Sequence, residues 1–477
     1  MELKIANKRS APLFLVGVIS TIAVGVIISS MIASLSAILW LLLFAVVTLP
    51  VFIDRIILRQ SIDLFGPVYI SALTYFIHFV GPLAGSIFLG IEHPLFPEPN
   101  MKLGMIYITI GLLSFYIGYY IIRPRAIRAR THTDIRKKKR WFRRAIFPVV
   151  GIYCGITIAC YLVFWLPRYG GLEGYIALFS GVGATNYALQ GLGYARALIF
   201  LAVSAFHLSF LNILVLAKQR LRTMDWLLIV FAGLVSTASM LLTGNRVFIL
   251  WNFGLPIVIM HYYKRRLSFS LTLVGLVLAF VIVVVYTSSF RSPGSLKLDS
   301  SNIVSEMTSF YVTQTAEALV VSDLVDRQAQ ILGFQYGRTL LAALANPIPR
   351  AIFPGKPATA GELYTRYFHP DIWRSGVTYV GMPWLGELYL NGGALGVVLG
   401  MVVTGMLWRM IYVHFISKRS LIAYYEYAVS AFCLYFLIVR GTLQATAFPL
   451  LWLIPTILGI GLISKTQRGL GPINVGS

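Results

Sequence analysis

Residues 384–412 read WLGELYLNGGALGVVLGMVVTGMLWRMIY and join a polar segment to a long apolar run. The first part contains Glu387 and Asn391, whereas residues 392–412 carry Arg409 as their only charged residue. A helix of about 20 apolar residues crosses the hydrocarbon core of a bilayer. The stretch therefore predicts a membrane-spanning helix that begins directly after a polar loop.

The whole chain has the composition of a membrane protein. Of its 477 residues, 58% are hydrophobic and 12% are charged, whereas soluble domains average about 25% charged residues. We therefore predict an all-α polytopic membrane protein with about twelve transmembrane helices. The apolar runs that are long enough lie at 11–31, 33–53, 64–89, 103–122, 147–166, 197–217, 226–243, 247–263, 268–289, 392–412, 420–439 and 444–464.

These runs divide the chain into three parts. Residues 1–290 contain the first nine predicted helices, residues 291–390 form one large loop, and residues 391–477 contain the last three helices and a tail. Cytoplasmic loops of membrane proteins carry an excess of Lys and Arg. With the N-terminus inside, 27 of the 40 Lys and Arg residues lie inside. The pattern predicts cytoplasmic N- and C-termini and an outer location for the large loop.

The net charge of +23 and the cysteine and histidine patterns exclude several classes of function. The basic run Arg136-Lys-Lys-Lys-Arg140 lies in a predicted cytoplasmic loop, where attraction to anionic lipid explains it, and we expect no nucleic-acid partner. The three cysteines lie inside apolar runs and the seven histidines show no ligand spacing. We therefore predict no metal site and no cofactor.

The first half of the large loop has the periodicity of an amphipathic helix. Apolar residues from Ile303 to Val325 recur every three or four positions, and Ser301 or Asn302 is suited to cap the helix. We expect this helix to pack on the outer ends of the spans or to lie in the membrane interface, with Asp323 facing water.

The second half of the loop concentrates positive charge, and the prolines at 347, 349, 354 and 357 stiffen the segment that carries Arg350 and Lys356. Rigidly placed guanidinium groups suit a diphosphate; the alternative is pairing with loop carboxylates such as Glu362. Arg246 and Arg440 reach the same side from the ends of two spans, either to bind an anion or to extend toward headgroups. The further candidate cations of the loop are Arg338, Arg366 and Arg374.

Two groups of this region are candidates for acid–base chemistry. Glu387 lies at the entrance of the tenth predicted span, where partial removal from water favours a general base. Its alternative roles are an acid at a helix N-terminus or a salt-bridge partner of a loop arginine. His369, in His369-Pro-Asp371, is the second candidate.

Several of these segments together resemble the O-antigen polymerase (Wzy-type) family of oligosaccharide repeat-unit polymerases. The resemblance rests on Gly244-Asn-Arg246, Asn346-Pro-Ile-Pro-Arg350, Pro354-Gly-Lys-Pro357, Gly386-Glu-Leu-Tyr-Leu-Asn-Gly-Gly393 and Arg440-Gly441. It extends to the layout of many spans with one large outer loop before the last few. The loop histidine motif of O-antigen ligases has no counterpart here, since Gly386-Glu387 stands in that region.

The resemblance implies a GT-C-like glycosyltransferase of the bacterial inner membrane, with its active face in the periplasm. Such an enzyme joins undecaprenyl-diphosphate-linked repeat units without a metal, and a chain-length regulator is an expected partner. For this reaction the residues themselves favour Glu387, Arg350 and Arg246 for catalysis, with Glu387 as the base for the acceptor hydroxyl and the arginines beside the diphosphate. The residues expected to bind substrate are Lys356, Arg338, Arg440, Arg366, Arg374, Tyr389, Asn391 and His369. The alternatives are an O-antigen ligase and a lipid-linked oligosaccharide flippase or other transporter.

Overall fold

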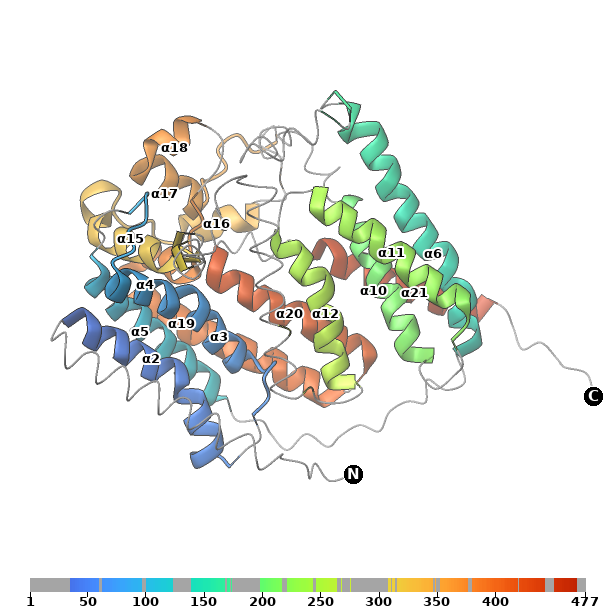
Figure 1. Ribbon diagram of the computed structural model, residues 1–477, viewed down its shortest axis with the longest axis horizontal. Helices are drawn as coiled ribbons and strands as arrows, with labels where there is room; N and C mark the ends of the chain where they lie inside the picture. The colour runs from blue at the N-terminus through green and yellow to red at the C-terminus, as the bar shows by residue number, and fades with distance from the viewer. Residues whose placement is uncertain are drawn as a thin grey trace, which may run out of the picture.

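A computed structural model of the chain (Figure 1) describes its structure over a series of ranges, and within them every regular element is a helix. Side chains are described for these ranges except at 139–144, 241–242, 246–250, 416, 450–451 and 464–469. The described residues are 35–59, 62–96, 100–122, 139–167, 170–171, 173, 198–216, 221–242, 246–263, 267, 275, 308–309, 311–313, 315–345, 348, 352–375, 380–418, 420–441 and 450–469.

Most of the long helices coincide with the predicted apolar runs. They are α2 (Leu35–Phe52) with the π-helical turn η1 (Ile53–Ile57), α3 (Pro67–Tyr75), η2 (Phe76–Val80) and α4 (Gly81–Leu89), α5 (Met101–Ile121), α6 (Lys139–Cys160) with η4 (Tyr161–Trp165), α10 (Leu201–Leu216), α11 (Thr223–Leu242), α12 (Arg246–Tyr263), α19 (Trp384–Lys418), α20 (Leu421–Arg440) and α21 (Leu450–Gly469).

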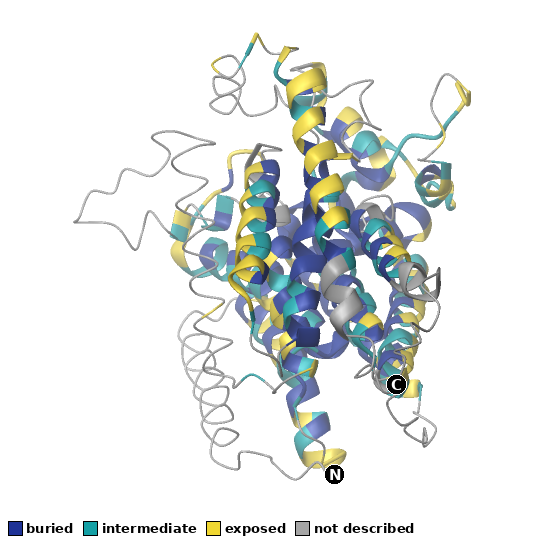
Figure 2. Cartoon of the chain, turned by 90° about the vertical axis from the view of Figure 1, so that its right-hand side faces the viewer, coloured by how far each residue is buried: buried dark blue, intermediate teal, exposed yellow. Residues whose placement is uncertain are grey.

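Within the described ranges, seven helices are long and apolar enough to cross a membrane, and two shorter apolar helices accompany them. The protein is therefore a multi-pass membrane protein. The number twelve stays a prediction, because the run 11–31 and nearly all of the run 268–289 lie outside the described residues. Large apolar side chains are exposed along the outward faces of these helices, as a lipid environment requires, and buried residues fill the middle of the bundle (Figure 2).

The bundle consists of two groups of helices that meet at α20. One core forms among α2, α3, α4, α5 and α19, and the second among α6, α10, α12, α20 and α21. In Figure 1 the first group lies on the left and the second on the right, and α12 and α20 are the members of the second group on the side of the first. Helix α20 contacts α3 and α19 of the first group and α12 and α21 of the second, so it joins the two groups.

Four short helices gather at one end of the first group, which we call the loop end. They are α15 (Glu317–Ile331), α16 (Arg338–Ala345), α17 (Ala360–Phe368) and α18 (Pro370–Ser375), and Figure 1 shows them at the upper left. Asn100, just before α5, donates a hydrogen bond to Asp326 of α15 (3.2 Å), so the loop end contains the start of α5.

The predicted amphipathic helix over residues 303–325 overlaps α15, which packs on the helices of the bundle at the loop end. All residues of α15 from Glu317 to Val325 are buried, because the helix packs between α5, η2 and α19. Asp323, which we expected to face water, is 8% exposed, whereas Asp326 is exposed. The predicted capping residues Ser301 and Asn302 lie outside the described residues.

Helix α19 begins at Trp384, earlier than the predicted span, and is broken at Gly392 and Gly393. Gly393 has φ = 58° and ψ = −145°, a conformation that side-chain-bearing residues rarely adopt. The break leaves the carbonyl groups of the preceding turn without helical partners. They accept other hydrogen bonds instead: Leu390 from the backbone of Gln335 (2.9 Å) and Asn391 from that of Tyr336 (3.0 Å). The break thus attaches the loop segment before α16 to α19.

Candidate active site

The end of α20 packs directly against the start of α19, which brings two of the predicted site residues to one place. Gly441 follows Arg440 in the left-handed conformation (φ = 41°) and closes α20. A side chain at position 441 would collide with the backbone of Met382 and Pro383. A side chain at Gly381 would collide with the guanidinium of Arg440. Close backbone contact between these segments therefore fixes where Arg440 lies.

Arg440 is a half-buried cation at the end of α20. Its guanidinium forms no hydrogen bond and no ion pair with any residue in the described part of the chain. A guanidinium group presents five hydrogen-bond donors in a planar fork, which matches phosphate oxygens. Arg440 is thus available to bind an anion at the loop end.

A buried histidine–carboxylate pair lies next to Arg440. Glu317, the first residue of α15, is 3% exposed, and its carboxylate accepts a hydrogen bond from Nδ1 of His78 in η2 (3.2 Å). The other ring nitrogen of His78 lies 3.0 Å from the hydroxyl of Tyr435 in α20. Burial acts to raise the pKa of Glu317, but His78 and the charge of Arg440 outweigh it and hold that pKa below its ordinary value. The carboxylate is therefore charged at neutral pH.

Glu387 lies in the first turn of α19 and is 1% exposed. Its backbone N–H donates to the carbonyl of Pro383 (3.0 Å), the residue against which Gly441 packs. Its own carbonyl accepts from the side chain of Asn391 (2.7 Å). The structure thus places Glu387 inside the packed start of α19, at the same corner as Arg440.

Asn391 connects α19 to the start of α16, where Arg338 lies. The Asn391 side chain accepts from the backbone N–H of Gly337 (2.8 Å) and donates to the hydroxyl of Thr339 (2.7 Å), so it holds the first turn of α16. Arg338 lies between these two residues and is exposed. Tyr389 is half-buried, with its ring edge-on to Tyr107 at 4.9 Å.

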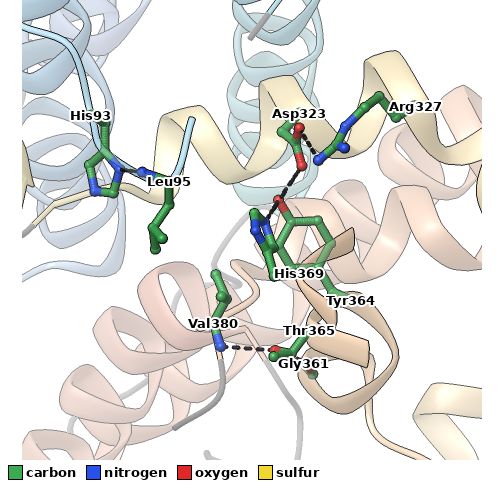
Figure 3. Close-up of polar contacts among 9 residues, drawn as sticks. All are labelled: His93, Leu95, Asp323, Arg327, Gly361, Tyr364, Thr365, His369 and Val380. Atoms are coloured by element: carbon green, nitrogen blue, oxygen red, sulfur yellow. Dashed lines mark hydrogen bonds and ion pairs between the residues drawn. The ribbon is translucent and has the colours of Figure 1, made fainter. Parts of the chain in front are cut away.

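His369 belongs to a third cluster, which joins α17 to α15 (Figure 3). The hydroxyl of Tyr364 donates to Asp323 (2.5 Å), and Nε2 of His369 lies 3.3 Å from that hydroxyl oxygen. Arg327 pairs with the second carboxylate oxygen of Asp323 (2.5 Å). Burial lowers the pKa of His369, and the charge of Asp323 offsets this only in part. At neutral pH the cluster is a chain of carboxylate, phenol and neutral imidazole.

The remaining predicted cations are scattered. Arg366 and Arg374 are exposed on α17 and α18, where Arg366 lies over the ring of Tyr367 and Arg374 pairs with Asp371. Nζ of Lys356 lies 3.5 Å from the carbonyl of Ile348. Arg246 is the first residue of α12, and its side chain is not among those described. Arg350 lies outside the described residues.

Sequence reasoning missed Glu317 and His78. A histidine in the middle of the apolar run 64–89 was the available signal, because ionisable residues inside a span usually have a polar partner there. The partner itself is 239 positions away in the chain, and no local pattern identifies it. Among the residues that the structure describes, no group of three or more His, Cys, Asp or Glu is arranged to hold a metal ion.

Comparison with known proteins identifies the family to which the chain belongs. Searches of curated proteins and of solved structures found no match. The sequence profile of O-antigen polysaccharide polymerase Wzy matches residues 13–468, nearly the whole chain. The chain therefore belongs to the O-antigen polysaccharide polymerase Wzy family.

Proposed function

We propose that the protein is a metal-independent glycosyltransferase that polymerises undecaprenyl-diphosphate-linked oligosaccharide repeat units. Family membership supports polymerisation. The structural observation that carries the site is the half-buried guanidinium of Arg440, which lies against Gly381 just before the start of α19 and acts on the charge of Glu317. Our proposal places this end on the outer face of the inner membrane, in a GT-C-like fold with twelve spans and cytoplasmic termini.

The reaction assigns distinct roles to Arg440 and Glu387. The hydroxyl oxygen of an acceptor sugar attacks the anomeric carbon of the donor, and the bond from that carbon to the diphosphate breaks. The hydroxyl proton passes to Glu387 as general base. The diphosphate leaves with its negative charge, which Arg440 stabilises together with Arg246, Arg350 and Lys356. Fixed cations accelerate the reaction because they need no reorganisation as the charge develops.

The neighbouring residues bind substrate or position these groups. Glu317 and His78 act as positioning residues, because the buried negative charge of Glu317 attracts the guanidinium of Arg440 and restrains its orientation. Tyr389 offers a ring for stacking on a sugar face, and Asn391 holds the start of α16. Further contacts to the glycan come from Arg338, Arg366, Arg374 and His369. A chain-length regulator is the protein partner that such a polymerase requires for a defined product length.

The test of this function is deletion in the native host, followed by analysis of the envelope glycolipids. A polymerase deletion leaves single repeat units on the final acceptor. Loss of a ligase would instead leave the acceptor uncapped while polymer accumulates on the lipid carrier. Loss of a flippase would remove lipid-linked substrate from the outer face. Either of the last two outcomes overturns the proposal.

Complementation of the deletion strain then tests the site. We expect Glu387→Gln and Arg350→Ala to insert normally but to restore no polymer. Lys102→Ala is the matched control, because Lys102 is an exposed cation at the same end of the bundle and has no proposed role. Polymer of normal length from both site variants would remove these assignments while leaving the proposed function intact.

A further inference from the structure

One part of the loop end exposes many large apolar side chains. Eight large apolar side chains between residues 331 and 353 are at least 37% exposed. Contiguous apolar patches on proteins mark contacts with other molecules or with a membrane. The eight residues, which we call the apolar stripe, are Ile331, Phe334, Tyr336, Leu341, Leu344, Ile348, Ile352 and Phe353.

The short helix α16 forms the middle of this stripe and has two distinct faces. Thr339 and Ala342 are buried toward the protein, with Thr339 bonded to Asn391 of α19. Leu341 and Leu344, three positions apart on the opposite face, are 58% and 71% exposed. Side chains three positions apart share one side of a helix. The outward side of α16 is therefore apolar, the reverse of a helix that faces water.

Helices α17 and α18 of the loop end differ sharply from α16. Between residues 354 and 375, Tyr367 is the single exposed large apolar side chain among those described. The exposed positions there include Arg366, Asp371 and Arg374. The loop end thus has one side suited to water, on α17 and α18, and one side suited to an apolar medium, on α16.

The apolar stripe continues the lipid-facing surface of α19. Below the break at Gly393, the exposed residues Leu395, Leu399 and Val403 recur every four positions along this helix. The ring of Phe334, in the stripe, lies against Gly393, two residues before Leu395. Asn391, which holds α16, is seven residues from the start of α19 and thus about 10 Å along its axis. These contacts place α16 about two turns inside the N-terminal end of α19, on the side of the apolar run that follows Gly393. We infer that this position is near the boundary of the hydrocarbon.

Two cations lie beside the stripe. Arg338 precedes Leu341 by three positions and is exposed, and Nζ of Lys356 is next to the carbonyl of Ile348. Cations beside an apolar face are typical of helices that lie in the plane of the interface, where they meet lipid phosphates.

We propose that α16 and its flanking residues lie in the membrane interface, with the apolar stripe among the outer parts of the acyl chains and Arg338 and Lys356 among the headgroup phosphates. The occupant of this surface is the lipid bilayer. The inference rests on exposure and on contacts with α19 and is independent of the proposed enzymatic reaction. It puts both cations at the depth where the diphosphate of any lipid-linked molecule lies.

Nitroxide labelling of the full-length protein in vesicles of phosphatidylethanolamine and phosphatidylglycerol tests this placement. Labels go on Leu344→Cys in the stripe and, as the matched control, on Asp371→Cys, whose native side chain is 93% exposed on α18. Wild-type protein carried through the same labelling measures any signal from Cys154, Cys160 and Cys433. Both positions are exposed, so neither label has to enter a packed core.

The accessibility of each label to oxygen, which concentrates in lipid, is compared with its accessibility to a water-soluble nickel complex. We expect the label at 344 to favour oxygen several-fold over the nickel complex, and the label at 371 to show the opposite preference. Equal behaviour of the two labels, both favouring the nickel complex, overturns the proposal. Low accessibility of the label at 344 to both reagents also overturns it, because a protein surface and not lipid would then cover α16.

Discussion

Nδ1 of His78 lies 3.2 Å from the carboxylate of Glu317, and the two side chains are only 11% and 4% exposed. The contact joins η2, in the middle of a membrane-spanning run, to the first residue of a helix from the large loop. Removing one member of a buried pair costs about 3–5 kcal/mol, since the other is left unpaired away from water. The pair is therefore a sensitive point of attachment between loop and bundle.

The first prediction concerns this pair. His78→Leu should lower the free energy of unfolding by about 3 kcal/mol, because the buried carboxyl of Glu317 loses its hydrogen-bond partner. The double variant His78→Leu/Glu317→Leu should recover part of that loss, because no buried charge remains. Thermal unfolding of the purified protein in detergent measures both effects. Additive losses from the two substitutions would show that the pair does not act as a unit.

The second prediction concerns pH. The pKa of His369 is lowered by burial, so the folded protein binds fewer protons at this site than the unfolded chain. Stability is then fully present above the ordinary histidine pKa of 6.5 and falls as the pH drops below it. His369→Gln should lose less stability than wild type over this interval. His414→Gln, at an exposed position, is the control and should keep the wild-type slope.

Glu317 affects stability over a separate, more acidic pH range than His369. Its pKa is lowered from 4.5, so its contribution to stability is present above pH 4.5 and is lost as the pH falls through the lower folded value. Glu317→Gln should abolish the loss of stability that occurs below pH 4.5. The loss of stability that begins below pH 6.5, which comes from His369, should stay unchanged. An unchanged curve below pH 4.5 would contradict a charged carboxylate at position 317.

A third prediction tests how α16 is held. Asn391→Leu removes the acceptor for the Gly337 N–H and the donor to Thr339, and each buried polar group left without a partner costs about 1–3 kcal/mol. Asn391→Asp keeps the acceptor and loses only the donor, so it should fall between wild type and Asn391→Leu. The readout is the rate of proteolytic cleavage in the segment around α16. Equal cleavage of all three proteins would show that Asn391 does not hold this segment.

A fourth prediction compares two adjacent glycines. Gly393→Ala should destabilise the protein by about 1–3 kcal/mol, because residue 393 has positive φ and the ring of Phe334 fills the space of a side chain. Gly392→Ala should be tolerated, because position 392 has negative φ and no atom within 4 Å of an added Cβ. Similar unfolding temperatures for both variants would contradict the conformation described for the break.

The membrane-spanning helices were predictable because each needs about 20 consecutive apolar residues to cross the hydrocarbon core, and such a run can be seen in the sequence alone. The predicted runs 103–122 and 420–439 coincide within two residues with α5 and α20. Gly81-Pro82 in the third run predicted a kink or a break, and a π-helical turn precedes it in the structure. The start of α19 was predicted too late, because the polar residues Glu387 and Asn391 resemble a loop when their buried partners are not known.

Of the candidate site, the sequence could predict only residues whose type is unusual at their position, such as a charged residue at the end of an apolar run. Arg440-Gly441 stood out as a charge at the end of a span, and the structure places it against the start of α19 near Glu387. The pairing of Glu317 with His78 depends on α15 entering the bundle, which no spacing in the sequence specifies. The burial of Asp323 depends likewise on Tyr364, which approaches from a different helix.

The most direct test of the central claim measures turnover by the purified protein in vesicles that contain undecaprenyl-diphosphate-linked repeat units. The wild type should produce a ladder of polymer and release undecaprenyl diphosphate. Arg440→Ala should remain folded and inserted but lose about 100- to 1,000-fold in turnover, the usual effect of removing one group that stabilises charge in a transition state. Arg440→Lys should retain part of the activity, and Lys102→Ala nearly all of it. Polymer formation by Arg440→Ala at the wild-type rate would contradict the account.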